Sequence, residues 1–232
     1  MVTGRIMKTL QQLNEEYIEF MKAPPAWSDS KKAKVRYVSQ WEELSKKFVR
    51  EPRRDISNMP MSKIWTWSDQ HFFHKNIIRY SDRPFNDLDE MNQALVDNYK
   101  ARVQPDDVCI WGGDVGFAPD EAINEILHQC PGYKILIIGN HDFRRKKLRK
   151  LHFDEIHVAY DYTLYDTQLV FTHYPFDTVE YPIVNIHGHS HTFNSEHPLC
   201  INVSVEQIDY VPITFEELAE KVKTRLISEE YI

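Results

Sequence analysis

The segment KILIIGNHD, residues 134–142, joins an uninterrupted apolar run to a cluster of polar residues. Such a run, without alternation of polar and apolar residues, is typical of a strand buried on both faces of a parallel sheet. Two earlier segments have the same form, DVCIWGGD at 107–114 and KIWTWSDQH at 63–71. The three segments therefore predict three buried strands, each followed directly by polar side chains.

The segments between these strands carry the signals of helices. Residues 86–103 begin with Asp87 and Glu90, which have the spacing of a capping box. Residues 118–132 have Pro119 near the expected helix start and Gly132 after its end. Strands that alternate with helices predict an α/β fold with parallel strands.

From residue 162 onward the pattern changes to one strand after another. Four short apolar segments follow, at 162–166, 168–175, 184–191 and 199–205. Only residues 214–227 are clearly helical, and Thr214 and Glu217 form a second capping-box pattern. We therefore expect a β-rich α/β sandwich.

Polar residues with oxygen or nitrogen donors follow five of the expected strands. Because ligands bind at the carboxyl ends of strands in α/β sheets, these side chains are expected to form one site. The candidate ligands are Asp69, His71, Asp114, Asn140, His173, His189 and His191. Seven groups are too many for one tetrahedral ion, so they indicate two metal ions, and one carboxylate can bridge both. The mixture of carboxylate, amide and imidazole favours Mn, Fe, Zn, Ni or Co over Ca.

The ordered pattern D-x-H, G-D, G-N-H-D, H and G-H-x-H resembles the calcineurin-like metallophosphoesterase superfamily, over about residues 64–210. The stretch SDQHFFHKNII, residues 68–78, further resembles a small bacterial and phage branch of it. The resemblance implies a four-layer α/β/β/α sandwich. It also implies that Asp69, His71 and His191 bind the first metal, Asp114 bridges, and Asn140, His173 and His189 bind the second.

The resemblance also implies the chemistry of this site, which is hydrolysis of a phosphate ester. The attacking group would be a hydroxide that bridges the two metals and attacks phosphorus in line with the leaving oxygen. His141 matches a histidine that contacts the phosphate and protonates the leaving group. His74, three residues beyond His71, is a further candidate for phosphate binding, together with Asn140 and His141. Manganese is the favoured ion.

Several substrate classes fit this prediction. Nucleotides and other small phosphomonoesters or diesters are favoured, and a nuclease acting on longer nucleic acid or a protein phosphatase are the alternatives. Residues 61–232 are acidic, with sixteen basic and twenty-seven acidic side chains in the chain after residue 60. That balance argues against a protein that coats nucleic acid, although FRRKKLRK at 143–150 could attract anions near the site.

Residues 1–60 differ from the rest of the chain and are expected to form a separate helical extension with a linker. Apolar residues recur at helical spacing in 7–22 and again in 35–49, and 51–62 reads as the linker. Two such stripes need a larger partner, either the catalytic domain or a second copy in a homodimer.

Nothing in the composition suggests a membrane protein or a secreted one. No window approaches a membrane span, and the first twenty residues lack the apolar core of a signal peptide. The three cysteines are widely spaced, which favours reduced core residues and a cytoplasmic location.

Overall fold

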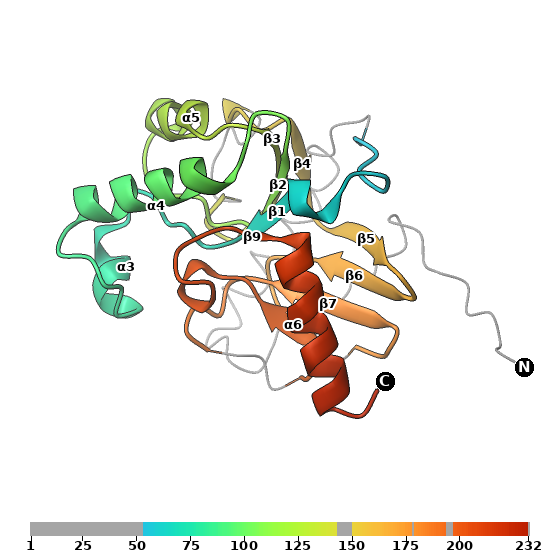
Figure 1. Cartoon of the computed structure of the whole chain (residues 1–232). Coiled ribbons are helices and arrows are strands. Elements are labelled where there is room, and N and C mark those ends of the chain that lie inside the picture. The colour runs from blue at the N-terminus through green and yellow to red at the C-terminus, as the bar shows by residue number, and fades with distance from the viewer. Residues whose placement is uncertain (1–52, 143–149, 178, 194–196, 232) are drawn as a thin grey trace, which may run out of the picture.

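Parallel strands form the centre of the larger of two β-sheets (Figure 1). The computed structural model describes residues 53–142, 150–177, 179–193 and 197–231. The larger sheet has the strand order β4-β3-β2-β1-β9, in which only β9 is antiparallel to its neighbour. Its strands are β1 (Ile64–Trp67), β2 (Val108–Trp111), β3 (Tyr133–Ile137), β4 (Glu155–His157) and β9 (Ile213–Thr214).

The second sheet has four strands in the order β5-β6-β7-β8. Strands β5 and β6 form an antiparallel hairpin, whereas β6, β7 and β8 are parallel. Its strands are β5 (Tyr160–Leu164), β6 (Thr167–Phe171), β7 (Ile183–His187) and β8 (Cys200–Asn202). A single bridge between Ser68, after β1, and Ser204, after β8, joins the carboxyl ends of the two sheets.

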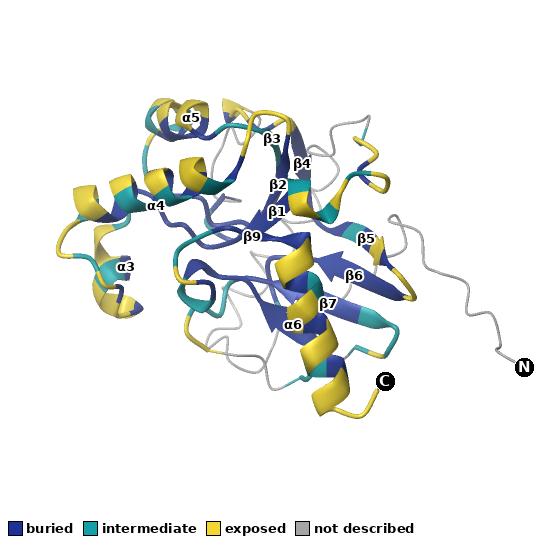
Figure 2. Cartoon of the chain, in the orientation of Figure 1, coloured by how far each residue is buried: buried dark blue, intermediate teal, exposed yellow. Residues whose placement is uncertain are grey.

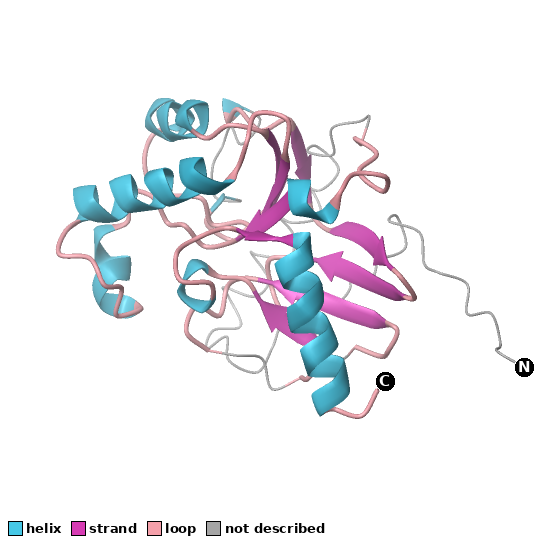
Figure 3. Cartoon of the chain, in the orientation of Figure 1, coloured by secondary structure: helices cyan, strands magenta, loops and turns pink. Residues whose placement is uncertain are grey.

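Helices lie on the outer sides of the two sheets (Figures 1 and 3). Tyr99 of α4 packs against Trp67 and Trp111 of the larger sheet, and Phe215 of α6 stacks on Phe171 of the smaller one. The helices bury one face and expose the other, while the strands are almost wholly buried (Figure 2). The helical elements are η1 (Met61–Lys63), α3 (Lys75–Tyr80), α4 (Leu88–Arg102), α5 (Asp120–Gln129), η4 (Val205–Gln207) and α6 (Phe215–Ser228).

The predicted α/β fold is confirmed, together with most of its local signals. The capping box of Thr214 and Glu217 is complete at the start of α6. At α4, Asp87 accepts a hydrogen bond from the Glu90 amide, but the Glu90 carboxylate binds Asn86 instead of closing the box. All three cysteines are buried and free, as expected for core residues. The short elements α3, β4 and β9 were not predicted, because none has enough residues to show a period.

The predicted helices at 7–22 and 35–49, and the dimer that they would form, lie outside the described residues, as does most of the basic segment 143–150. Residues 53–60, part of the predicted linker, do have described contacts with the domain. The Arg53 side chain pairs with Asp161, the Arg54 amide donates to Glu155, and Ile56 is buried in the core. No described helix is long and apolar enough to cross a membrane.

The capping box of α6 provides a test of the fold. Thr214→Ala removes the side chain that accepts from the Glu217 amide, so we expect the free energy of unfolding to fall by about 1 kcal/mol. Thr224→Ala is the matched control, because this threonine lies exposed inside the same helix and alanine favours helices there. Urea denaturation should separate the two variants; equal stability would show that the cap contributes nothing.

Candidate metal centre

The loops that follow β1, β2, β3, β6 and β7 meet at one edge of the two sheets. They bring together all seven predicted ligands. Six of these side chains form two groups, and within each group the ligand atoms all lie within 4.8 Å of one another. The first group is Asp69, His71 and His191, and the second is Asp114, His173 and His189. The predicted seventh ligand, Asn140, lies beside the second group.

The first group is built around a buried carboxylate with two different oxygens. Asp69 Oδ2 accepts hydrogen bonds from Ser68 Oγ, the His189 amide and Ser204 Oγ. Asp69 Oδ1 has no hydrogen-bond partner and lies 3.8 Å from His71 Nε2 and 4.0 Å from His191 Nε2. Both ring nitrogens of His71 are buried and also without a partner. Buried polar atoms without partners are costly, and a cation between them would remove that cost.

The second group is organised by hydrogen bonds that fix the histidine rings. His173 Nδ1 lies 2.8 Å from the Gly112 carbonyl oxygen, which places a proton on Nδ1 and leaves Nε2 as the ligand atom. Asn140 Oδ1 lies 2.9 Å from that Nε2 and 3.0 Å from His189 Nδ1. The three donor atoms therefore point toward one another, as ligands of one ion do.

Asp114 lies between the two groups. Its Oδ2 is 3.7 Å from His71 Nε2 in the first group and 3.5 Å from His173 Nε2 in the second. The same oxygen is 3.7 Å from His141 Nε2, and Oδ1 accepts from the His141 amide. Among the described residues, Asp114 therefore lies close to a histidine from each of the two groups.

The electrostatics of the site favour cations. Burial opposes ionisation of Asp114, but the charges of neighbouring histidines, His173 above all, lower the pKa of its carboxyl below the ordinary value. Burial also opposes the charged form of His173, yet Asp114 and Asp69 raise its pKa to about 9. In the absence of metal, a proton on His173 therefore occupies a region of negative potential, where a metal ion would compete with it.

Two other histidines are held neutral, the form in which imidazole binds a metal. Burial lowers the pKa of His71 well below its ordinary value. Burial, together with the charge of His173, lowers the pKa of His189 to about 3.

The backbone of the site is strained where the ligands are attached. Left-handed conformations cost most non-glycine residues about 1 kcal/mol or more, and they persist only where surrounding contacts enforce them. Five of the seven predicted ligands have such a backbone: Asp69 (φ 60°), His71 (φ 52°), Asp114 (φ 55°), His189 (φ 63°) and His191 (φ 48°). The loops therefore bend sharply at these five ligand positions.

Two glycines are required by the close approach of these loops. A Cβ on Gly139 would overlap the Asp114 carboxylate, and a Cβ on Gly188 would overlap Asp69 Oδ2 and Ser68 Oγ. Asp142, which sequence analysis does not place among the ligands, ties the loops together. Its carboxylate accepts from the amides of Asp114, Val115 and Gly139.

A buried ion pair that the sequence did not reveal supports the first group. Glu206 Oε1 lies 3.0 Å from His191 Nδ1 and 2.7 Å from Arg83 Nη2. Arg83 also donates to the backbone carbonyls of Asp69 and Gln70. One guanidinium therefore fixes the loop that carries Asp69 and His71, and through Glu206 it orients His191. Arg83 and Glu206 are separated by more than a hundred residues, and neither belongs to a motif with a ligand pattern.

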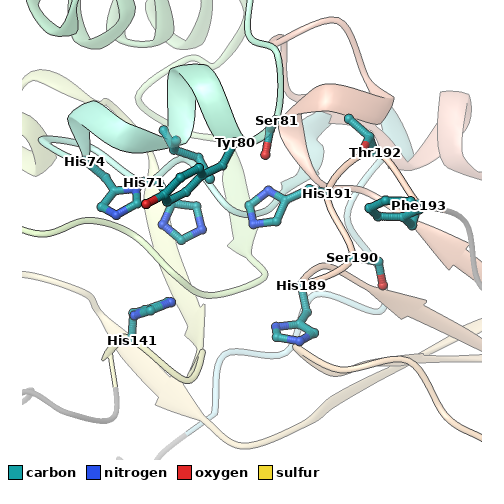
Figure 4. A pocket seen from close by; sticks show the side chains of 11 residues that line it. His71, His74, Tyr80, Ser81, His141, His189, Ser190, His191, Thr192 and Phe193 are labelled. Carbon is teal, nitrogen blue, oxygen red and sulfur yellow. The ribbon is translucent and has the colours of Figure 1, made fainter. Parts of the chain in front are cut away.

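The metal centre opens into a cavity of about 700 Å³ (Figure 4). His141 lies on its wall, facing the ligand histidines, as expected for a residue that contacts substrate. His74 is also on the wall, with its ring 5.5 Å from that of His71 and 4.1 Å from that of Phe117. Both predicted phosphate-binding histidines therefore border the space beside the ligands.

Comparison with known proteins agrees with this arrangement. The family model of the calcineurin-like phosphoesterases matches residues 62–230. The chain belongs to this family. The predicted superfamily is thereby confirmed, and the protein is a metal-dependent phosphoesterase.

Individual relatives say less about function. An uncharacterised protein of Methanocaldococcus jannaschii is 32% identical over 174 residues, which are 71% of this chain and 94% of the relative. A crystal structure of a protein of unknown function from Aquifex aeolicus has a TM-score of 0.54 and 28% identity, covering 68% of this chain and 97% of that one. Yfce, a phosphoesterase from E. coli, has a TM-score of 0.37 and 16% identity, covering 65% and 81%.

The ion pair behind His191 can be tested by its effect on metal binding. Glu206→Gln removes the charge that orients His191 and pairs with Arg83, so we expect Mn²⁺ affinity to fall by about 10-fold. Glu220→Gln, at an exposed position on α6, is the matched control. Calorimetric titration of each metal-free variant with Mn²⁺ measures the two affinities. An unchanged affinity in Glu206→Gln would contradict the role of this ion pair.

Proposed function

We propose that this phosphoesterase uses two divalent transition-metal ions, Mn²⁺ first among them, to hydrolyse small phosphomonoesters or diesters such as nucleotides. The observation that carries the proposal is the position of Asp114, with one oxygen within 3.7 Å of a histidine from each ligand group. The unpartnered Asp69 Oδ1 and His71 nitrogens beside it support the same conclusion. The three buried free cysteines agree with a reducing compartment such as the cytoplasm.

Each metal ion would have its own set of ligands. One ion would be held by Asp69, His71 and His191, and the other by Asn140, His173 and His189. Asp114 would contact both ions. Bound divalent ions supply Lewis acidity, which neutralises phosphate charge and lowers the pKa of water.

The side chains on the cavity wall would act on the substrate itself. His141 lines the cavity, and its Nε2 lies 3.7 Å from Asp114 Oδ2, where it can donate to a phosphate oxygen and protonate the leaving oxygen. His74, three residues beyond His71 on the same wall, can donate to a second phosphate oxygen. The Glu206 and Arg83 pair would keep His191 in the orientation that a metal ligand needs.

The direct test is a panel of phosphate monoesters and diesters. The metal-free protein should be assayed after separate addition of Mn²⁺, Ni²⁺, Zn²⁺ and Mg²⁺. We expect hydrolysis of small esters with a transition metal and little or none without one. Hydrolysis of long nucleic acid alone, with steep dependence on salt, would instead identify a nuclease.

Asp114→Asn tests the shared ligand. An amide carries no charge to neutralise two cations, so we expect the variant to bind fewer than two Mn²⁺ per chain and to lose roughly 100-fold or more in kcat/KM. Asp166→Asn is the control, because Asp166 is exposed in the turn after β5, and this variant should retain the bound Mn²⁺ and the wild-type kcat/KM. Metal analysis after Mn²⁺ reconstitution decides the matter. A wild-type chain that holds at most one ion would rule out the dinuclear site.

His141→Ala separates binding of metal from turnover. We expect both ions to remain bound, while kcat for alkyl esters falls by about 10²–10⁴-fold, because a poor leaving group depends on general-acid assistance. For p-nitrophenyl esters the loss should be smaller. His152→Ala, an exposed histidine outside the cavity lining, serves as the control. Equal losses for the two kinds of ester would reduce His141 to a phosphate-binding role, and loss of metal would show that it is a ligand.

A further inference from the structure

We propose that Tyr80 and Phe193 form an aromatic wall on which the organic group of the substrate stacks, so that the protein prefers phosphate esters of nucleosides. This inference rests on the proposed function, because it assumes that the phosphate binds at the ligand groups. It concerns the residues that would contact the organic group of the ester. The starting observation is where exposed aromatic rings occur in the described part of the chain.

Exposed aromatic rings gather around the metal centre. Six large apolar side chains are exposed among the described residues: Tyr80, Phe117, Tyr165, Phe193, Ile227 and Tyr231. Two of them, Tyr80 and Phe193, line the cavity, and Phe117 packs against His74 and His141 on its wall. Apolar surface that is concentrated at a concave, polar site indicates a ligand that covers it.

Phe193 is exposed although its backbone is held firmly. Its side chain is 77% exposed, yet its amide donates to the Ser190 carbonyl and its carbonyl accepts from Asn202 Nδ2. The same Asn202 amide group donates to the carbonyl of His191, a predicted ligand. The position of Phe193 is therefore tied to that of the metal site, and little backbone order has to be gained when a ligand binds.

Tyr80 borders the cavity on the other side of His191. It is the last residue of α3, the helix that starts directly after His74, and its ring centroid lies 6.3 Å from that of His74. Figure 4 shows Tyr80 beside His71 and His74, and Phe193 beyond His191. A phosphate held at the ligand histidines would therefore have an aromatic ring on either side of its ester group.

The rest of the lining fits a nucleoside better than a purely apolar group. Three hydroxyl-bearing residues also line the cavity: Ser81, Ser190 and Thr192. Their hydroxyls can bond to the sugar or to the edge of a base, while the rings contact its faces. A cavity of about 700 Å³ is large enough for one nucleotide.

The test compares two diesters that release the same leaving group. One is the p-nitrophenyl ester of thymidine 5′-monophosphate, and the other is methyl p-nitrophenyl phosphate. We expect the Mn²⁺-loaded wild type to show a kcat/KM at least about 10-fold higher for the thymidine ester. Tyr80→Ala and Phe193→Ala should each lower the ratio of the two kcat/KM values by about fivefold or more, the effect of removing one stacked ring.

Tyr165→Ala is the matched control, since Tyr165 is 82% exposed but lies in the turn between β5 and β6, outside the cavity lining. It should leave the ratio unchanged. If the wild type hydrolyses both esters equally well, and neither cavity variant changes the ratio, the aromatic wall is refuted while the phosphoesterase function stands. If the wild type hydrolyses no ester in the wider panel, the proposed function itself fails.

Discussion

Two carboxylates, Asp69 and Asp114, lie buried at the carboxyl ends of neighbouring parallel strands, and the rest of the site is arranged around their charge. Negative charge out of contact with water is unfavourable unless a hydrogen bond, a cation or a proton compensates it. One oxygen of Asp69 receives three hydrogen bonds and the other receives none. The protein thus provides hydrogen bonds for one oxygen of Asp69 and leaves the other oxygen facing the histidines, where a metal ion would compensate its charge.

That arrangement depends on two sheets meeting at their ends. The bridge between Ser68 and Ser204 and the hydrogen bond from the Val205 amide to the Ser68 carbonyl hold the end of β8 against the end of β1. Glu206 follows immediately and reaches both His191 and Arg83. The short segment after β8 therefore supports the site from the second sheet. Contacts of this kind, between segments far apart in the sequence, enforce the strained backbone of the ligands.

The site has a rigid part and an open part. Most of the ligands and their supporting hydrogen bonds are buried, which suits a reaction that requires fixed charges. The outer part of the cavity carries exposed rings and hydroxyls instead, which suits recognition of a variable organic group. Tyr80 and Phe193, which line this outer part, lie outside the ligand motifs.

The fold class and the candidate metal ligands could be predicted from the amino-acid sequence alone. Apolar runs such as 135–138 predict buried strands, and a polar group that follows a strand lies near its carboxyl end. The resemblance of the ordered motifs to those of the metallophosphoesterases then assigned each candidate ligand to a metal. Only the tertiary structure placed Arg83 and Glu206 behind the ligands and Tyr80 and Phe193 beside them. The left-handed backbone of Asp69 and Asp114 was likewise decided by tertiary contacts. The physical reason is that these features depend on buried hydrogen bonds and close approaches between distant segments, which leave no periodic or neighbouring signal in the chain.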